Sequence, residues 1–108
     1  MKTYLLLYRA TYDGIAQKIE KTPLDQKEIN DLWMAWVKKC GIQLVDPGQI
    51  FDRSFNITLD RFESANTDII GFSILKAQDL FEAEELLFGN PHLKISKDHS
   101  FILYESKS

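Results

Sequence analysis

The sequence has little of several features that usually indicate a class of function. It contains one cysteine in 108 residues, so an internal disulfide is excluded and a reducing compartment fits best. Its longest apolar run falls far short of the roughly 20 residues that cross a membrane. The N-terminus shows no apolar run ending in small residues, as a signal peptide would. We therefore expect a cytoplasmic protein with no membrane partner.

An excess of positive charge is also missing. The chain has 13 Lys and Arg residues against 16 Asp and Glu residues, which gives a net charge of −3. A protein that binds nucleic acid usually carries a basic stripe, so no nucleic-acid partner is expected. The two histidines and the cysteine lack the spacing of metal ligands, and no glycine-rich phosphate loop occurs. No metal and no cofactor are expected.

The remaining composition is typical of a globular protein, with 44% hydrophobic and 27% charged residues. At this length we expect a single domain over residues 1–108. Apolar runs predict strands over 2–12, 42–51, 53–62, 69–77 and 100–106. Pro47 interrupts the second of these, which favours an edge position or a break in that strand. The segment 15–21 fits a loop or a short helical turn, 63–68 a turn, and 93–100 an irregular stretch.

The first predicted helix spans 22–41. Thr22 suits its N-cap, Pro23 its first position, and Asp25 completes a spacing like that of a capping box. Gly41 is the expected end of the helix. Its apolar stripe comprises Ile29, Leu32, Trp33, Trp36, Val37 and Cys40, and in this position we expect Cys40 to be a core residue.

The second predicted helix spans 78–89. Asp79 and Glu82 have the spacing of a capping box, and Gly89 closes the helix. Its inner stripe comprises Leu80, Ala83, Leu86 and Leu87. The acidic run 82–85 is expected to be a solvated face of this helix.

If the 53–62 strand extends a hairpin, the order becomes βαββαβ, an α+β fold of the ferredoxin-like type. The first and third strands of that arrangement lie centrally, and both helices cover one face of an antiparallel sheet. The central strands are nevertheless apolar on both faces. A monomer seldom leaves such a patch in water, so we predict a homodimer that packs sheet to sheet about a two-fold axis.

Several segments together resemble the YCII-related family of dimeric α/β barrels. They are "KTYLLLYRA", "WMAWVKKCGIQLVDPG", "IIGFSILKAQDLFEAEELLFGNPHL" and the closing "FILYES". The resemblance covers nearly the whole chain except 13–21 and 52–67. It implies a dimer whose sheets face each other, with a cleft between sheet and helices in each subunit.

Some members of that family use a His–Asp dyad, and this sequence departs from it at both positions. No histidine precedes residue 92, and Asn90 stands where the resemblance places the aspartate. An amide cannot act as a base. The Asp-Gly-Pro-Phe signature of one branch is also absent, since the comparable stretch reads "TDIIGF". We therefore do not expect this protein to use the His–Asp chemistry of those family members.

The candidate ligand-binding residues are Tyr8, Trp33, Trp36, Asn90 and His92. Each has an alternative. His92 could cover the end of the second helix, or point into the cleft as a base with Asp31 as its carboxylate partner. The two tryptophans could pack in the core or form an aromatic wall.

Other polar residues have simpler interpretations. Tyr4, Tyr8 and Tyr12 share one sheet face, where they either line the dimer interface or hydrogen-bond a ligand. Arg9 could hold an anion, but a surface ion pair is favoured. His99, in the polar stretch "KDHS", is expected to be exposed.

Two functions follow from these residues. The first is a dimeric protein that binds a small aromatic or acidic molecule in a helix–sheet cleft. The alternative is an enzyme of the lyase or isomerase type, using His92 with Asp31 or a tyrosine. A haem or quinone monooxygenase of the broader barrel group is permitted by the fold, but no ligand residue supports it.

Overall fold

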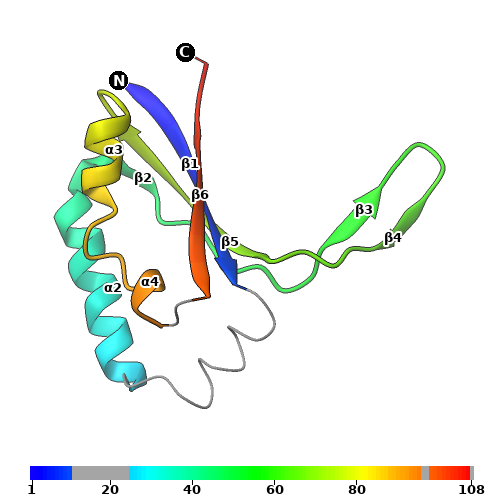
Figure 1. Ribbon diagram of the computed structural model, residues 1–108, viewed down its shortest axis with the longest axis horizontal. Helices are drawn as coiled ribbons and strands as arrows, with labels where there is room; N and C mark the ends of the chain where they lie inside the picture. Colours follow the sequence, from blue (N-terminus) through cyan, green and yellow to red (C-terminus); the bar gives the residue numbers. More distant parts are fainter. Residues whose placement is uncertain (11–24, 96–97, 108) are drawn as a thin grey trace.

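The computed structural model describes residues 1–10, 25–95 and 98–107 (Figure 1). The elements follow in the order β1 (Lys2–Ala10), α2 (Gln26–Cys40), η1 (Gly41–Gln43), β2 (Leu44–Asp46), β3 (Phe55–Ile57), β4 (Phe62–Ser64), β5 (Ile69–Ala77), α3 (Leu80–Leu86), α4 (His92–Ile95) and β6 (His99–Glu105). The predictions for Tyr12, for the loop or turn over 15–21 and for the helix start at Thr22 and Pro23 lie outside the described residues.

Four strands form an antiparallel sheet in the order β2-β5-β1-β6. The first and third strands of the predicted βαββαβ arrangement, β1 and β5, are therefore central, as expected. Helices α2 and α3 lie on the same side of this sheet (Figure 1). The α+β class is confirmed. The short strand β2 occupies an edge and stops before Pro47, which confirms both expectations for that proline.

The prediction of one strand over 53–62 is wrong. Strands β3 and β4 form a separate two-stranded hairpin, which projects from the side of the sheet opposite the helices (Figure 1). Its turn is closed where the Thr58 N–H donates to the Arg61 carbonyl at 2.8 Å and the Arg61 N–H donates to Thr58 Oγ1 at 3.0 Å. At its base the Ala65 N–H donates to the Ser54 carbonyl at 2.9 Å. We call residues 54–65 the arm.

Local capping chemistry fixes the start of each long helix. Asp25 is the N-cap of α2, because its Oδ1 accepts from the Glu28 N–H at 2.7 Å. Gly41 ends this helix as predicted, with a φ of 58°. Asp79 caps α3 as predicted, accepting from the Glu82 N–H at 2.9 Å.

The second helix is shorter than expected, and a further helix follows it. An irregular stretch was expected over 93–100, but α4 occupies His92–Ile95 and β6 begins at His99. Asn90 starts α4, because its Oδ1 accepts from the His92 N–H at 2.9 Å. The turn between α3 and α4 therefore depends on the side chain of Asn90. The spacing of apolar residues gives no sign of such a polar contact.

The core lies between the sheet and the helices. Its cluster of buried residues comprises Tyr4, Trp36, Cys40, Leu75, Ala77, Ala83 and Leu86. Trp36 Nε1 donates to the Leu86 carbonyl at 2.7 Å, and this bond ties α2 to α3. Burial raises the pKa of the Cys40 thiol, and the residue is 3% exposed, which confirms its interpretation as a core residue.

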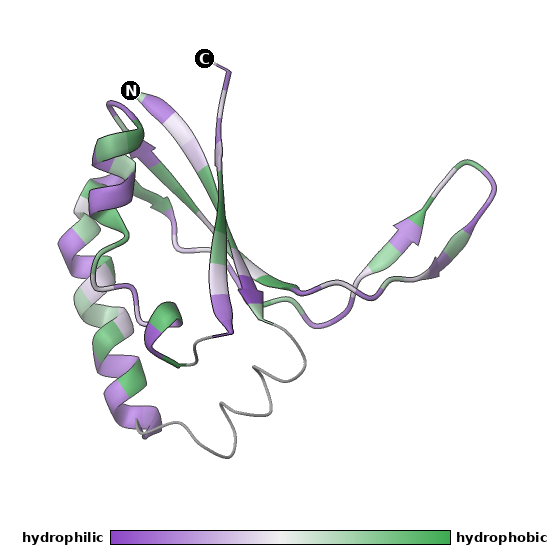
Figure 2. Ribbon diagram, in the orientation of Figure 1, coloured by the Kyte–Doolittle hydropathy of each residue, from purple (hydrophilic) through white to green (hydrophobic). Residues whose placement is uncertain are grey.

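The opposite face of the sheet is also apolar. Strand register places Leu5, Leu7, Phe72, Ile74, Ile102 and Tyr104 on it, and we call these six residues the open face. Hydrophobic stretches run along the central strands and recur in the arm (Figure 2). In the part of the chain that the structure describes, no helix covers the open face (Figure 1). The expectation that both faces are apolar is confirmed.

Register also corrects the position of the tyrosines. Tyr4 and Tyr8 pair with Leu75 and Gly71 on the face that the helices cover, and both are buried. They are therefore not interface residues of the open face. Separately, none of the helices within the described residues is long and apolar enough to cross a membrane.

Candidate functional site

A cavity of about 720 Å³ opens between α2, the segment 47–51 and the sheet. Helix α2 contributes Asn30, Trp33 and Met34, the sheet contributes Tyr8 and residues 70–72, and His92, Ile95 and His99 close one end. This volume falls within the roughly 300–1,000 Å³ of small-molecule sites. The lining is mostly apolar and aromatic, so the cavity suits a ligand with a hydrophobic body.

The wall formed by 47–51 is held by main-chain bonds to β5. The Phe51 N–H donates to the Ile70 carbonyl at 2.8 Å, and the Phe72 N–H donates to the Gln49 carbonyl at 3.2 Å. Gly48 permits this approach, because its φ is 82° and a Cβ there would lie 1.6 Å from the Phe72 carbonyl oxygen. The cavity is thus bounded on this side by a fixed segment of backbone.

Tyr8 is the centre of an aromatic cluster at the floor of the cavity. Its ring meets Trp33, His92 and Phe101 edge to face, with centroid separations of 5.7, 5.1 and 5.5 Å. Such edge-to-face pairs add to the energy of burial alone. Trp33 remains half-buried, so one face of its ring is available to the cavity.

A directed chain of hydrogen bonds passes through the Tyr8 hydroxyl. Asn90 Nδ2 donates to Tyr8 Oη at 3.3 Å, and Ser73 Oγ donates to the Pro47 carbonyl at 2.7 Å. Because the hydroxyl of Ser73 is committed to that carbonyl, the 2.7 Å bond between Tyr8 and Ser73 has Tyr8 as its donor. Burial raises the pKa of Tyr8, so the phenol stays protonated at neutral pH.

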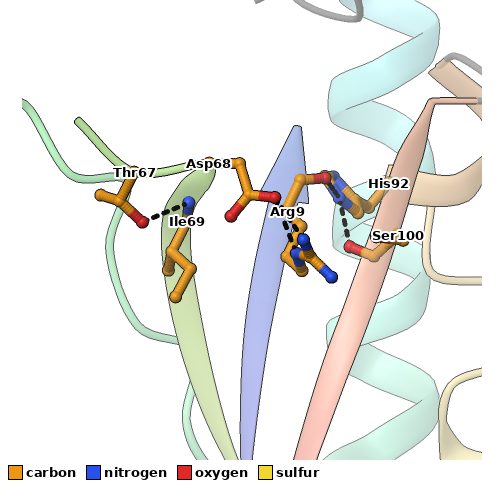
Figure 3. Close-up of polar contacts among 6 residues, drawn as sticks. All are labelled: Arg9, Thr67, Asp68, Ile69, His92 and Ser100. Atoms are coloured by element: carbon orange, nitrogen blue, oxygen red, sulfur yellow. Dashed lines mark hydrogen bonds and ion pairs between the residues drawn. The ribbon is translucent and has the colours of Figure 1, made fainter. Parts of the chain in front are cut away.

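His92 is buried and is bound to the main chain of two strands (Figure 3). Its Nε2 lies 2.9 Å from the Arg9 carbonyl oxygen and 3.0 Å from that of Ser100. Both partners are acceptors, so Nε2 carries the proton. The imidazole N–H therefore bridges the ends of β1 and β6, and Nε2 is not available as a base.

Arg9 turns its side chain to the other face of the sheet (Figure 3). Its Nε donates to Asp68 Oδ2 at 2.9 Å, and a second bond runs from Nη2 to the same oxygen. The guanidinium lowers the pKa of the Asp68 carboxyl. The Arg9 side chain is 41% exposed and that of Asp68 is 34% exposed. The interpretation of Arg9 as part of a surface ion pair is therefore confirmed.

Asp31, the carboxylate proposed to assist His92, is not brought to it. The side chain of Asp31 is 66% exposed on α2, where the Lys27 ammonium lies 3.9 Å away. The pairing of His92 with Asp31 therefore has no support in the geometry. The other proposed partner of His92 was a tyrosine. The ring of Tyr8 contacts that of His92 edge to face, but the hydroxyl proton of Tyr8 points to Ser73.

The remaining candidate residues divide between the cavity and the core. Trp33 lines the cavity, whereas Trp36 is 2% exposed and packs in the core. Asn90 lies behind the cavity floor and acts through Tyr8. The expectation of an exposed His99 is wrong, because this residue is 5% exposed and its ring lies 4.6 Å from that of His92.

Sequence reasoning missed Ser73 and the wall 47–51. The break "DPG" was a signal for the wall, because a proline and a glycine at a sheet edge mark backbone that leaves the regular strand. Nothing local marks Ser73, whose partners are distant in sequence. Among the described residues, no group of three or more His, Cys, Asp or Glu side chains gathers in a way that could hold a metal ion.

A scan of the chain against models of known protein families found no match, and a search of curated proteins found none. The resemblance to the YCII-related family therefore stays a prediction. The features of the molecule that bear on function are the cavity, the chain of hydrogen bonds through Tyr8 and the open face.

Proposed function

We propose that this protein binds a small molecule with an aromatic or other hydrophobic body in the cavity beside Trp33. The observation that carries the proposal is a cavity of about 720 Å³ with a mostly apolar lining that includes the rings of Tyr8, Trp33 and Phe51. A planar ligand would stack on the half-buried Trp33 ring and contact Met34 and Ile50.

Binding is favoured over catalysis because the polar groups at the floor are already committed. The hydroxyl of Tyr8 and the amide of Asn90 satisfy each other and their neighbours, and Nε2 of His92 donates to carbonyls. A catalytic acid or base must reach the proton that it transfers. The hydrogen bonds of these groups instead fix the floor of the cavity, and small-molecule sites are usually formed before the ligand binds.

We further propose that the subunit has the ferredoxin-like βαββαβ topology and functions as a homodimer of the α/β-barrel type, related to the YCII family. The strand order β2-β5-β1-β6 agrees with that topology. The open face supports the dimer, because six apolar side chains lie together on a surface that a second copy would cover.

The binding proposal is tested by titrating the ¹⁵N-labelled protein with 2-naphthoate and with its neutral counterpart 2-naphthamide. We expect saturable shifts of the amide resonances of Tyr8, Trp33, Gly48 and Ile95. In the variant Trp33→Ala the dissociation constant should rise about tenfold, a loss of about 1.4 kcal/mol, since one stacked ring contributes about that much.

The matched control is Phe81→Ala, which removes a ring that is 69% exposed on α3 and does not line the cavity. Its dissociation constants should equal those of the unaltered protein. Stronger binding of the naphthoate would indicate an acidic ligand. If neither compound shifts the resonances of the cavity residues, the cavity is not a site for this class of molecule.

A further inference from the structure

The arm has one apolar and one polar face. Phe62 pairs directly with Ile57, and Phe55 lies two residues from Ile57 on the same side of the hairpin. The rings of Phe55 and Phe62 stack with centroids 5.2 Å apart. Asn56 and Glu63 pair on the opposite side. The alternation that resembles a half-buried strand in the sequence therefore produces a half-apolar ribbon.

The apolar face of the arm is uncovered within its own subunit. Residues 55–64 are all exposed, with Ile57 at 68%, Phe62 at 70% and Leu59 at the tip at 101%. A two-stranded hairpin is marginal by itself in water. Apolar side chains on such a ribbon favour association with another surface. The arm therefore has the character of a segment that packs against a partner.

The direction of the arm identifies the partner as a second copy of this chain. The arm projects on the side of the sheet opposite the helices, which is the side of the open face (Figures 1 and 2). A copy packed on the open face would lie beside the arm. The two-fold axis of such a dimer would give each copy the same contact, so two arms would enclose the pair.

The areas agree with this arrangement. The open face spans three strands, and at about 4.8 Å per strand and about 3.3 Å per residue its area is roughly 400 Å², so two faces bury about 800 Å². That is less than the roughly 1,000 Å² that a stable interface needs. If each arm buries about 150 Å² of its own surface and about 150 Å² of its partner, the two arms add about 600 Å². The sheets and arms together then bury about 1,400 Å², which lies within the usual range of about 1,200–2,000 Å².

We propose that the arm of each subunit packs its apolar face, formed by Phe55, Ile57 and Phe62, against the other subunit of the dimer. This inference rests on the dimer proposed above and adds the segment that holds it together. The tip residue Leu59 lies against the partner, and the polar pair Asn56 and Glu63 faces solvent.

The first test compares dissociation constants of the dimer by sedimentation equilibrium. The double variant Ile57→Ser with Phe62→Ser removes the apolar face, and Asn56→Ser with Glu63→Gln is the matched control on the other face of the same hairpin. The dissociation constant should rise at least tenfold in the first and stay within twofold in the control. Leu7→Glu, on the open face, should yield monomers.

The second test places the arm directly. A nitroxide attached through Leu59→Cys on unlabelled protein is mixed with ¹⁵N-labelled protein, and line broadening in the labelled copy reports the approach of the other subunit's arm. Cys40 is buried at 3% exposure, so the label goes to the arm. We expect broadening that disappears when Leu7→Glu is present in both copies.

The outcomes separate the two proposals. If the protein is dimeric and Leu7→Glu is monomeric, but the arm variant keeps its dissociation constant or no broadening is seen, the arm proposal is overturned while the dimer stands. If the unaltered protein is still a monomer at about 1 mM, roughly 100 times the concentration of about 10 μM used for sedimentation, the dimer and the arm proposals are both overturned. The proposal of ligand binding is tested separately, by the naphthoate titration.

Discussion

Asn90 shows how a single amide can organise the floor of the cavity. Its Oδ1 accepts from the main chain of His92 and its Nδ2 donates to the Tyr8 hydroxyl, so both ends are used. A carboxylate of the same shape could replace only the first of these bonds. The amide is therefore the side chain that suits this position.

We expect Asn90→Asp to destabilise the protein by about 1–3 kcal/mol at pH 7, because a buried donor is lost and a charge is placed at a site that is 3% exposed. Burial raises the pKa of such a carboxyl above its unfolded value. The destabilisation should therefore be present above the folded pKa and diminish as pH falls through it. Urea unfolding between pH 4 and 8 measures this trend.

The control for that substitution is Asn66→Asp, at an exposed position. It should change the free energy of unfolding by less than about 0.5 kcal/mol at any of these pH values. If Asn90→Asp were as stable as the control at pH 7, the hydrogen-bond chain through Tyr8 would not be a determinant of the fold.

At the scale of elements, the segment 47–51 depends on a single residue. Gly48 lies at a φ of 82°, and a Cβ there would lie 1.6 Å from the Phe72 carbonyl oxygen. Gly41 has a positive φ of 58° as well, but a Cβ there would meet nothing within 4 Å. A side chain at Gly41 would therefore cause backbone strain alone, whereas one at Gly48 would cause strain and a steric clash.

We expect Gly41→Ala to cost about 1–3 kcal/mol, because a φ of 58° with a ψ of −133° is strained for any residue other than glycine. Gly48→Ala adds a clash with the Phe72 carbonyl oxygen and should cost clearly more. Only Gly48→Ala should also move the cavity wall. Thermal unfolding measures the cost, and amide shifts of Gln49 and Phe72 report the displacement. Equal costs for the two variants would show that the close approach of 47–51 to β5 is not fixed.

The elements that could be predicted from the sequence are those specified by neighbouring residues. Asp79 and Gly41 bound their helices as expected, because a cap acts within one turn. The hairpin was missed because Phe55, Ile57 and Leu59 alternate without a break up to the turn, and only the step of three residues from Leu59 to Phe62 departs from the spacing of a single strand. Periodicity indicates a strand but does not show where it reverses.

The site could be predicted only in part, because it is assembled from distant segments. Trp33 and Tyr8 were predicted to be ligand-binding residues, and both line the cavity. Ser73 and the role of Asn90 could not be recognised, since their partners lie 65 and 82 residues away. His99 was expected to be exposed because its neighbours are polar, yet the ring of His92 covers it.

At the scale of the whole molecule, the subunit exposes more surface than a compact monomer of its mass. The chain exposes 7798 Å², whereas a folded monomer of this mass exposes about 6,200 Å². Association would remove apolar surface of this kind from water. The shape of the subunit thus agrees with folding that is coupled to dimerisation.

If folding and dimerisation are coupled, the midpoint of thermal unfolding must depend on protein concentration. A tenfold increase stabilises a dimer by about 1.4 kcal/mol, which corresponds to a rise of about 3–6 °C for two chains of this length. Leu7→Glu, on the open face, should abolish the dependence. Ile42→Glu, at a position that is 97% exposed on η1, is the matched control and should retain it. A midpoint that stays constant from 5 to 500 μM, roughly two tenfold steps, would mean that the open face remains in water and that its apolar side chains are tolerated by a monomer.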